Sequence, residues 1–198
     1  MANVRPDHAI VAGMVETGAR VLDLGCGDGE LMAVLQREKN AKVEGVELDE
    51  QSIYQCVAKG LSVLHSDFAR GLSSYPDGSF DYVILNQSLQ EVRHVDWALT
   101  ESFRVGRGVI VGFPNFGLWS ARCSYFFSGR TPVTRSLPHR WYDTPNVRFL
   151  TVTDFKDYCR DRHYHIVDAS YLNDAKPVRW RPNLFASLAI IKMMRNPA

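Results

Sequence analysis

A buried strand that leads directly into a glycine-rich loop is the feature that most limits how this chain can fold. Arg20–Leu24 is short and apolar, and glycines follow it at positions 25, 27 and 29. That is how a buried parallel strand ends in a tight loop. Glycine lacks a Cβ, so backbone amides in such a loop can approach a ligand closely. Apolar residues at helical spacing in Gly29–Glu38 then predict a helix N-terminus, which favours a carboxylate or phosphate.

The chain continues with strands and helices in alternation. The expected strands are Lys42–Leu48, Leu61–His65, Ser79–Leu85 and Gly108–Phe113, and the expected helices are Glu50–Lys59 and Val95–Arg104. Alternation at this spacing is typical of βαβ units and predicts a parallel sheet with right-handed crossovers.

The C-terminal part departs from this alternation. A helix is expected over Asp154–Arg162, with Thr153 as its N-cap. Two final strands, His165–Tyr171 and Leu184–Met193, are joined only by a proline-containing loop, so they are expected to run antiparallel. We therefore predict one α/β domain over residues 1–198. Its fold is three-layered and doubly wound, with a mostly parallel seven-stranded sheet and an antiparallel C-terminal strand.

Acidic side chains stand where a nucleoside ligand would need them. Asp23 lies two residues before the first loop glycine, Glu47 ends the second strand and Asp67 follows the third. The loop spacing is GxGxG, whereas a dinucleotide fingerprint requires GxGxxG. The pattern resembles motif I of the class I, Rossmann-like methyltransferases. That resemblance implies that Asp23 lies by the methionyl amine of S-adenosylmethionine, Glu47 by the ribose hydroxyls and Asp67 by the adenine amino group.

The alternative for each acid alone is a solvated strand end, and Asp67 is the weakest of the three. The full set of expected cofactor-binding residues for S-adenosylmethionine or S-adenosylhomocysteine is Asp23, Gly25, Cys26, Gly27, Gly29, Glu47, Leu48, Asp67, Phe68 and Asn86. No catalytic residue can be assigned. Many small-molecule methyltransferases carry a histidine soon after the fourth strand, but here Glu91 precedes Val92 and the first histidine is His94.

Composition excludes several other classes of function. The net charge of +1 gives no reason to expect nucleic acid as a partner. No window is apolar enough to span a bilayer, and the N-terminus does not have the pattern of a signal peptide. The four cysteines lie far apart and form no CxxC, so neither a metal site nor a disulfide is expected. These features are typical of a cytoplasmic protein, and they leave the oligomeric state open, a homodimer included.

Several longer stretches carry a more specific resemblance. The segments PNFGLW (114–119), GRTPVT (129–134), WYDTPN (141–146) and PNLFASLA (182–189), with LNQSLQEV (85–92), closely resemble the MetW family of methionine biosynthesis proteins. Two departures are Leu118, where many members have histidine, and His139, where tyrosine is common. The resemblance implies a bacterial cytoplasmic protein that acts beside homoserine O-acyltransferase. It leaves open whether the chain is an accessory subunit or an active methyltransferase on a small molecule.

Residues 112–150 are expected to form an insertion that covers the cofactor side of the sheet. The segment contains four prolines, many aromatic residues and five arginines (Arg122, Arg130, Arg135, Arg140 and Arg148). Arginine with aromatics is typical of protein interfaces and also of RNA-stacking surfaces. We expect Phe126 and Phe127 to be buried. The candidates for a cofactor lid or a partner contact are Trp119, Arg140, Trp141 and Tyr142.

Overall fold

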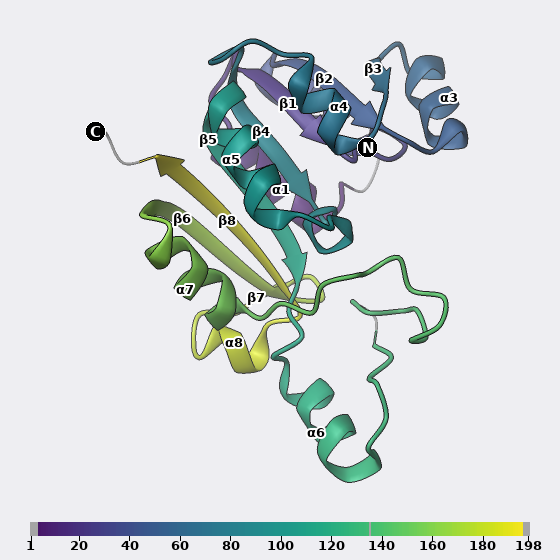
Figure 1. The fold of residues 1–198 in the computed structure, drawn as a ribbon, viewed down its shortest axis with the longest axis vertical. Coiled ribbons are helices and arrows are strands. Elements are labelled where there is room, and N and C mark those ends of the chain that lie inside the picture. The colour runs from purple at the N-terminus through teal and green to yellow at the C-terminus, as the bar shows by residue number, and fades with distance from the viewer. Residues whose placement is uncertain (1–3, 135, 196–198) are drawn as a thin grey trace.

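Eight strands form one sheet in the computed structural model, which describes residues 4–134 and 136–195 (Figure 1). The strand order is β3-β2-β1-β4-β5-β8-β6-β7. The strands are β1 Arg20–Leu24, β2 Lys42–Glu47, β3 Ser62–His65, β4 Phe80–Asn86, β5 Gly106–Pro114, β6 Tyr164–Asn173, β7 Lys176–Pro177 and β8 Leu188–Arg195. β1 to β5 pair in parallel, and β8 lies antiparallel between β5 and β6.

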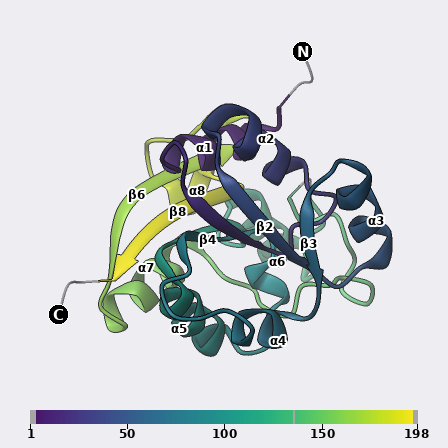
Figure 2. The same cartoon turned by 90° about the horizontal axis from the view of Figure 1, so that it is seen from above.

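Helices cover both faces of this sheet, as Figure 2 shows from above. The helical segments are α1 Pro6–Met14, α2 Glu30–Lys39, α3 Glu50–Ala58, α4 Phe68–Ser73, η1 Leu89–Glu91, α5 Val95–Val105, α6 Trp119–Ser128, α7 Val152–Asp161 and α8 Pro182–Phe185. Two separate cores result, because successive strand residues point to opposite faces. Leu22 and Leu24 pack with α5 and α7, whereas Val21 packs with α1 and α2.

The predicted α/β fold with its antiparallel C-terminal strand is confirmed, and β1 has the predicted bounds. The sheet has eight strands rather than seven, because the two residues of β7 add a short edge beside β6. The last strand begins at Leu188, not at residue 184, since Pro182–Phe185 forms the short helix α8. In the described part of the chain, no helix is long and apolar enough to cross a membrane.

The N-cap of α7 was also predicted wrongly. Thr151, not Thr153, occupies that position, and its hydroxyl accepts a hydrogen bond from the backbone N–H of Asp154. The Asp154 carboxylate accepts in return from the backbone N–H of Thr151. This reciprocal pair is a capping box, which satisfies two donors that the helix start would leave free. The helix therefore begins two residues earlier than its apolar spacing indicated.

Among the described residues of 115–150, the helix α6 is the one regular element, and an irregular stretch follows it. α6 extends away from the sheet at the bottom of Figure 1. Phe126 and Phe127 are 83% and 80% exposed, so the prediction that they are buried is wrong. Their aromatic rings contact each other in an edge-to-face arrangement instead of a core. The physical reason is that α6 stands clear of both cores.

Candidate functional site

The glycine loop after β1 has a backbone conformation that depends on its glycines. Gly25, Gly27 and Gly29 all have positive φ, between 54° and 78°, a conformation in which side chains are strained. At Gly29 a Cβ would also collide with Leu61 and Cys56. The backbone N–H of Gly25 donates to the Val46 carbonyl over 2.8 Å, which fixes the loop against the end of β2. Positive φ therefore favours glycine at all three positions, and the Cβ collision excludes other residues at Gly29.

The Glu47 carboxylate accepts hydrogen bonds from the glycine loop and from the backbone that follows β2. Its Oε2 accepts a hydrogen bond from the backbone N–H of Gly27 over 2.8 Å, and its Oε1 accepts from the N–H groups of Leu48 and Asp49. These three donors fix the carboxylate between the glycine loop and the end of β2. Each carboxylate oxygen can accept more than one hydrogen bond, so the group retains capacity for the hydroxyls of a ribose.

Asp23 is the most unusual group in the site. The residue is 2% exposed, and no hydrogen bond or ion pair within the described residues reaches its carboxylate. Burial, with a smaller contribution from the charge of Glu47, raises the pKa of Asp23 from 3.8 to about 7. A buried carboxylate without a partner costs free energy unless a cation neutralises it. The position therefore fits the ammonium group of a methionyl ligand.

A cavity of about 420 Å³ lies on the Glu47 side of the loop, within the range of small-molecule sites. Among its lining residues are Gly27, Glu47, Leu48 and Asp67. The Asp67 carboxylate already accepts from the backbone N–H of Arg70 and caps α4. The side chain of Phe68, another predicted contact, lies outside the described part of the structure.

A second, smaller cavity of about 160 Å³ lies on the Asp23 side. It is lined by Arg5, His8, Asp23, Gly25, Cys26, Gly27, Asp28, Leu31, Asn86 and Gln87. The two cavities share Gly25, Gly27 and Gln87, so the glycine loop separates an Asp23 side from a Glu47 side. This division matches a ligand with a methionyl arm and a nucleoside arm.

Sequence reasoning missed the polar residues at the start of α1. Arg5 and His8 line this second cavity, and Asp7 forms hydrogen bonds with two of its other lining residues. The buried Asp7 carboxylate accepts hydrogen bonds from Arg5, from Asn86 over 3.1 Å and from Gln87 over 3.0 Å. Burial opposes ionisation of Asp7, but the bond from Asn86 and the charges of His8 and Arg5 hold its pKa below the ordinary value. Pro6 at the first helical position was a usable signal for the helix. Nothing in the sequence placed it against β4.

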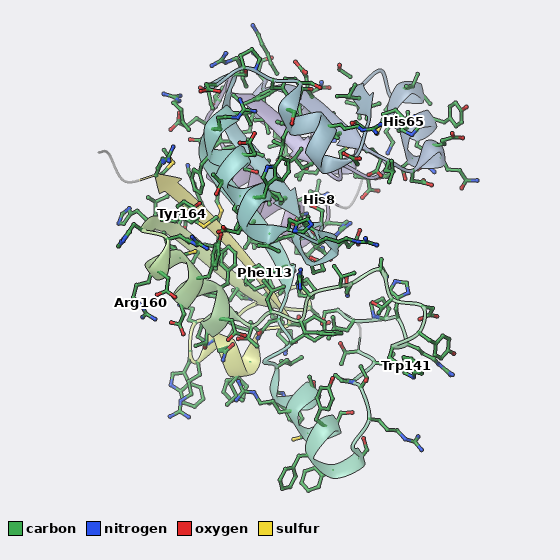
Figure 3. The ribbon with its side chains drawn as sticks, in the orientation of Figure 1. His8, His65, Phe113, Trp141, Arg160 and Tyr164 are labelled. Carbon is green, nitrogen blue, oxygen red and sulfur yellow. The ribbon has the colours of Figure 1, made fainter. Side chains whose placement is uncertain are left out.

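The loop after β4 has no histidine before His94, but His8 of α1 lines the Asp23 cavity. It is buried beside Asp7, with 3.9 Å between His8 Nε2 and Asp7 Oδ2 (Figure 3). Burial lowers the pKa of His8, and the carboxylate of Asp7 only partly offsets this effect. The imidazole is therefore neutral at pH 7 and retains a nitrogen that can accept a proton.

The loop after β4 connects the pocket to the later insertion. The backbone carbonyl of Gln90 accepts from the N–H groups of Val147 and Arg148, over 2.9 and 3.0 Å. Burial and the charge of Glu47 raise the pKa of Glu91, while His139 opposes this shift. The far end of the insertion thus lies directly against the pocket loop.

The four candidate lid or partner residues do not line either cavity of the cofactor site. Trp119 begins α6. Arg140, Trp141 and Tyr142 border a different cavity of about 580 Å³ beside the end of α6. Trp141 projects outward from the lower loop in Figure 3.

Comparison with known proteins agrees with this geometry. The family model described as "Methionine biosynthesis protein MetW" matches residues 5–193. The chain belongs to the MetW family. Its match begins at Arg5, so the family region includes α1, whose residues complete the Asp23 cavity.

A longer relative contains a MetW region within a larger protein. The bifunctional methionine biosynthesis protein MetXA/MetW of Rhodopirellula baltica is 33% identical over 202 residues. The alignment covers 96% of this chain and 32% of that protein, so the chain spans about a third of the length of this relative.

Solved structures share the fold at low sequence identity. An S-adenosylmethionine-dependent methyltransferase from Archaeoglobus fulgidus superposes with a TM-score of 0.69 at 16% identity, covering 95% of this chain and 94% of that one. The 1,6-didemethyltoxoflavin-N1-methyltransferase of Burkholderia thailandensis, solved with S-adenosylhomocysteine, gives a TM-score of 0.66 at 16% identity, covering 99% and 79%. At this identity the likeness shows the class I methyltransferase fold.

Proposed function

We propose that the chain binds S-adenosylmethionine or S-adenosylhomocysteine and acts in the cytoplasm as an accessory or regulatory subunit of homoserine O-acyltransferase. The observation that carries the ligand assignment is the buried carboxylate of Asp23, to which no described residue donates a hydrogen bond, beside a loop whose three glycines all have positive φ. The Asp23 carboxylate would hold the methionyl ammonium, and Glu47 would accept from the ribose hydroxyls. Asp67 and Leu48 would border the adenine.

The partner assignment is supported by the bifunctional relative. Its name joins MetXA, the acyltransferase that the family resemblance implies, to MetW in one polypeptide. Activities that are fused in one protein often work together when they occur on separate chains. The missing histidine after β4 and the dense insertion over residues 112–150 favour an accessory role.

Calorimetric titration tests the ligand, and an acyltransferase assay tests the role. We expect Asp23→Asn and Glu47→Gln each to weaken binding by roughly 10- to 150-fold, since a hydrogen bond to a charged group contributes roughly 1.5–3 kcal/mol. Asp161→Asn, at the end of α7, is the control and should bind as the parent does. Unchanged affinity in both pocket variants would refute the pocket. If adding the protein, with or without ligand, leaves the rate of the acyltransferase unchanged, the accessory role is refuted.

His8 favours a second candidate function, methyl transfer to a small molecule. A neutral imidazole in the wall of the Asp23 cavity is suited to accept the proton that an oxygen or nitrogen nucleophile loses on methylation. Incubation with S-adenosylmethionine and a fractionated metabolite extract tests this function. A fraction that yields S-adenosylhomocysteine with the parent, and far less with His8→Gln, would make methyl transfer the leading function.

A further inference from the structure

The helix α6 exposes several large aromatic side chains. Only Ala121 among its ten residues is buried, while Trp119, Tyr125, Phe126 and Phe127 are exposed. Figure 1 shows the helix standing clear of the sheet and of the other helices. A helix of this length has marginal stability without tertiary packing. Contiguous exposed apolar patches on proteins mark interaction sites.

Positive charge surrounds this apolar helix. Residues 113–150 contain five of the 23 lysines and arginines of the chain but only one acidic residue, Asp143, of its 22. This segment therefore carries a charge of +4 in a chain whose total is +1, which leaves −3 for all other residues. Charge of one sign gathered on one segment selects a partner surface of the opposite sign.

A cavity beside the C-terminal end of α6 combines both properties. It measures about 580 Å³, and its lining includes Arg130, Arg140, Trp141 and Tyr142. The Arg140 guanidinium donates to the Tyr142 hydroxyl over 3.2 Å, and no described carboxylate pairs with it. An arginine held beside exposed aromatic rings is the residue combination that dominates binding energy at protein interfaces.

We propose that this surface docks an acidic face of homoserine O-acyltransferase, an inference that rests on the function proposed above. The docking surface comprises Phe126, Phe127, Arg130, Arg140, Trp141 and Tyr142. The aromatic residues of α6 supply the apolar anchors, and the arginines of the adjoining cavity receive partner carboxylates. The partner's identity follows from the relative in which MetXA and MetW form one chain.

Two other occupants fit the surface less well. A second copy paired symmetrically through this surface would bring two +4 segments together, and like charges across an interface cost affinity. A nucleic acid would need positive charge spread along a path for its phosphates, whereas the net charge outside this segment is negative. An acidic protein surface with apolar pockets matches both the aromatics and the arginines.

Affinity for the cognate acyltransferase, measured by surface plasmon resonance with the full chain, tests the proposal. The test variants are Phe126→Ser with Phe127→Ser, and Arg130→Glu with Arg140→Glu. The controls are Tyr54→Ser on α3, a tyrosine of similar exposure, and Arg37→Glu on α2, an exposed arginine far from α6. We expect each test pair to raise the Kd at least 30-fold and each control less than threefold. The effect of the arginine pair should shrink at high salt.

Parallel measurements separate the outcomes. Binding of S-adenosylhomocysteine by every variant, at parental affinity, shows that the fold and the pocket are intact. Parent and test variants that bind the acyltransferase equally well would overturn the docking surface while leaving the proposed function standing. A parent that does not bind the acyltransferase would overturn the accessory role and the assigned occupant together. Self-association of the parent that both test pairs abolish, or tight salt-resistant binding of oligouridine, would assign the surface to a second copy or to RNA instead.

Discussion

Asp23 makes the free protein less stable than it could be, and this cost depends on pH in a predictable way. Its pKa rises from 3.8 to about 7 on folding, so the folded protein binds the extra proton between these values. Stability falls with rising pH wherever the folded state binds more protons than the unfolded state. At 1.36 kcal/mol per pKa unit, the raised pKa costs about 2 kcal/mol of stability at pH 5 and about 4 kcal/mol at pH 8.

Replacing Asp23 by asparagine removes this penalty without changing the shape of the side chain. Urea denaturation without ligand gives the free energy of unfolding of Asp23→Asn and of the parent. We expect the difference between them, in favour of the variant, to be about 2–3 kcal/mol larger at pH 8 than at pH 5. The variant should also lose affinity for S-adenosylmethionine, because stability and binding make opposite demands on this group. A buried carboxylate without a partner is costly in the free protein and favourable once an ammonium group arrives.

The same substitution at Asp81 provides the control with the opposite sign. The Asp81 carboxylate accepts hydrogen bonds from the Arg20 backbone and the Arg107 side chain, and these bonds lower its pKa. Its contribution to stability is present above the unfolded pKa and is lost as the pH falls, so Asp81→Asn should destabilise the protein at pH 8. If Asp23→Asn also destabilises at pH 8, the carboxylate is not held in an unfavourable environment and the argument fails.

Three further results are expected. Calorimetry of ligand binding at pH 7, in buffers of different ionisation enthalpy, should show net release of protons, because the raised pKa keeps part of the Asp23 population protonated until the ammonium binds. Gly29→Ala should lower the free energy of unfolding by about 1–3 kcal/mol in urea, because the added Cβ would collide with Leu61. The control Gly13→Ala should not destabilise the protein, because a Cβ there has no neighbouring atom within 4 Å. Asn115→Ala should cost roughly 2–4 kcal/mol in thermal unfolding, because this buried amide links the end of β5 to α7 and α8 through two donated and two accepted hydrogen bonds.

The parallel half of the sheet could be read from sequence because its signals are local. β1 is an apolar run that ends at glycines, so its bounds were predicted to the residue. The acids at Asp23 and Glu47 lie at the ends of adjacent strands, and parallel pairing of β1 with β2 brings them to one edge. The position of the glycine loop therefore followed from spacing, whereas the roles expected for its two acids came from the resemblance to motif I of the class I methyltransferases.

The other wall of the pocket could not be read in this way. Asp7 meets Asn86 across 79 positions of sequence, and His8 reaches the pocket only because α1 packs on α2 and β8. Apolar spacing in residues 6–14 can indicate a helix, but it does not say which strand end the polar residues at its start will meet. For this reason the sequence predicted no histidine in the site, whereas the fold supplies one.

The error at Phe126 and Phe127 has a different cause. Burial was expected because large apolar side chains in a chain that folds alone belong inside it. That rule assumes that the chain supplies its own core, and four large apolar residues of α6 (Trp119, Tyr125, Phe126 and Phe127) violate it within a single helix. Local disagreement of this kind is expected where function, not stability, selects the residues. Because the exposed rings coincide with the basic segment of an otherwise acidic molecule, the most economical explanation is that their core is completed by a partner protein.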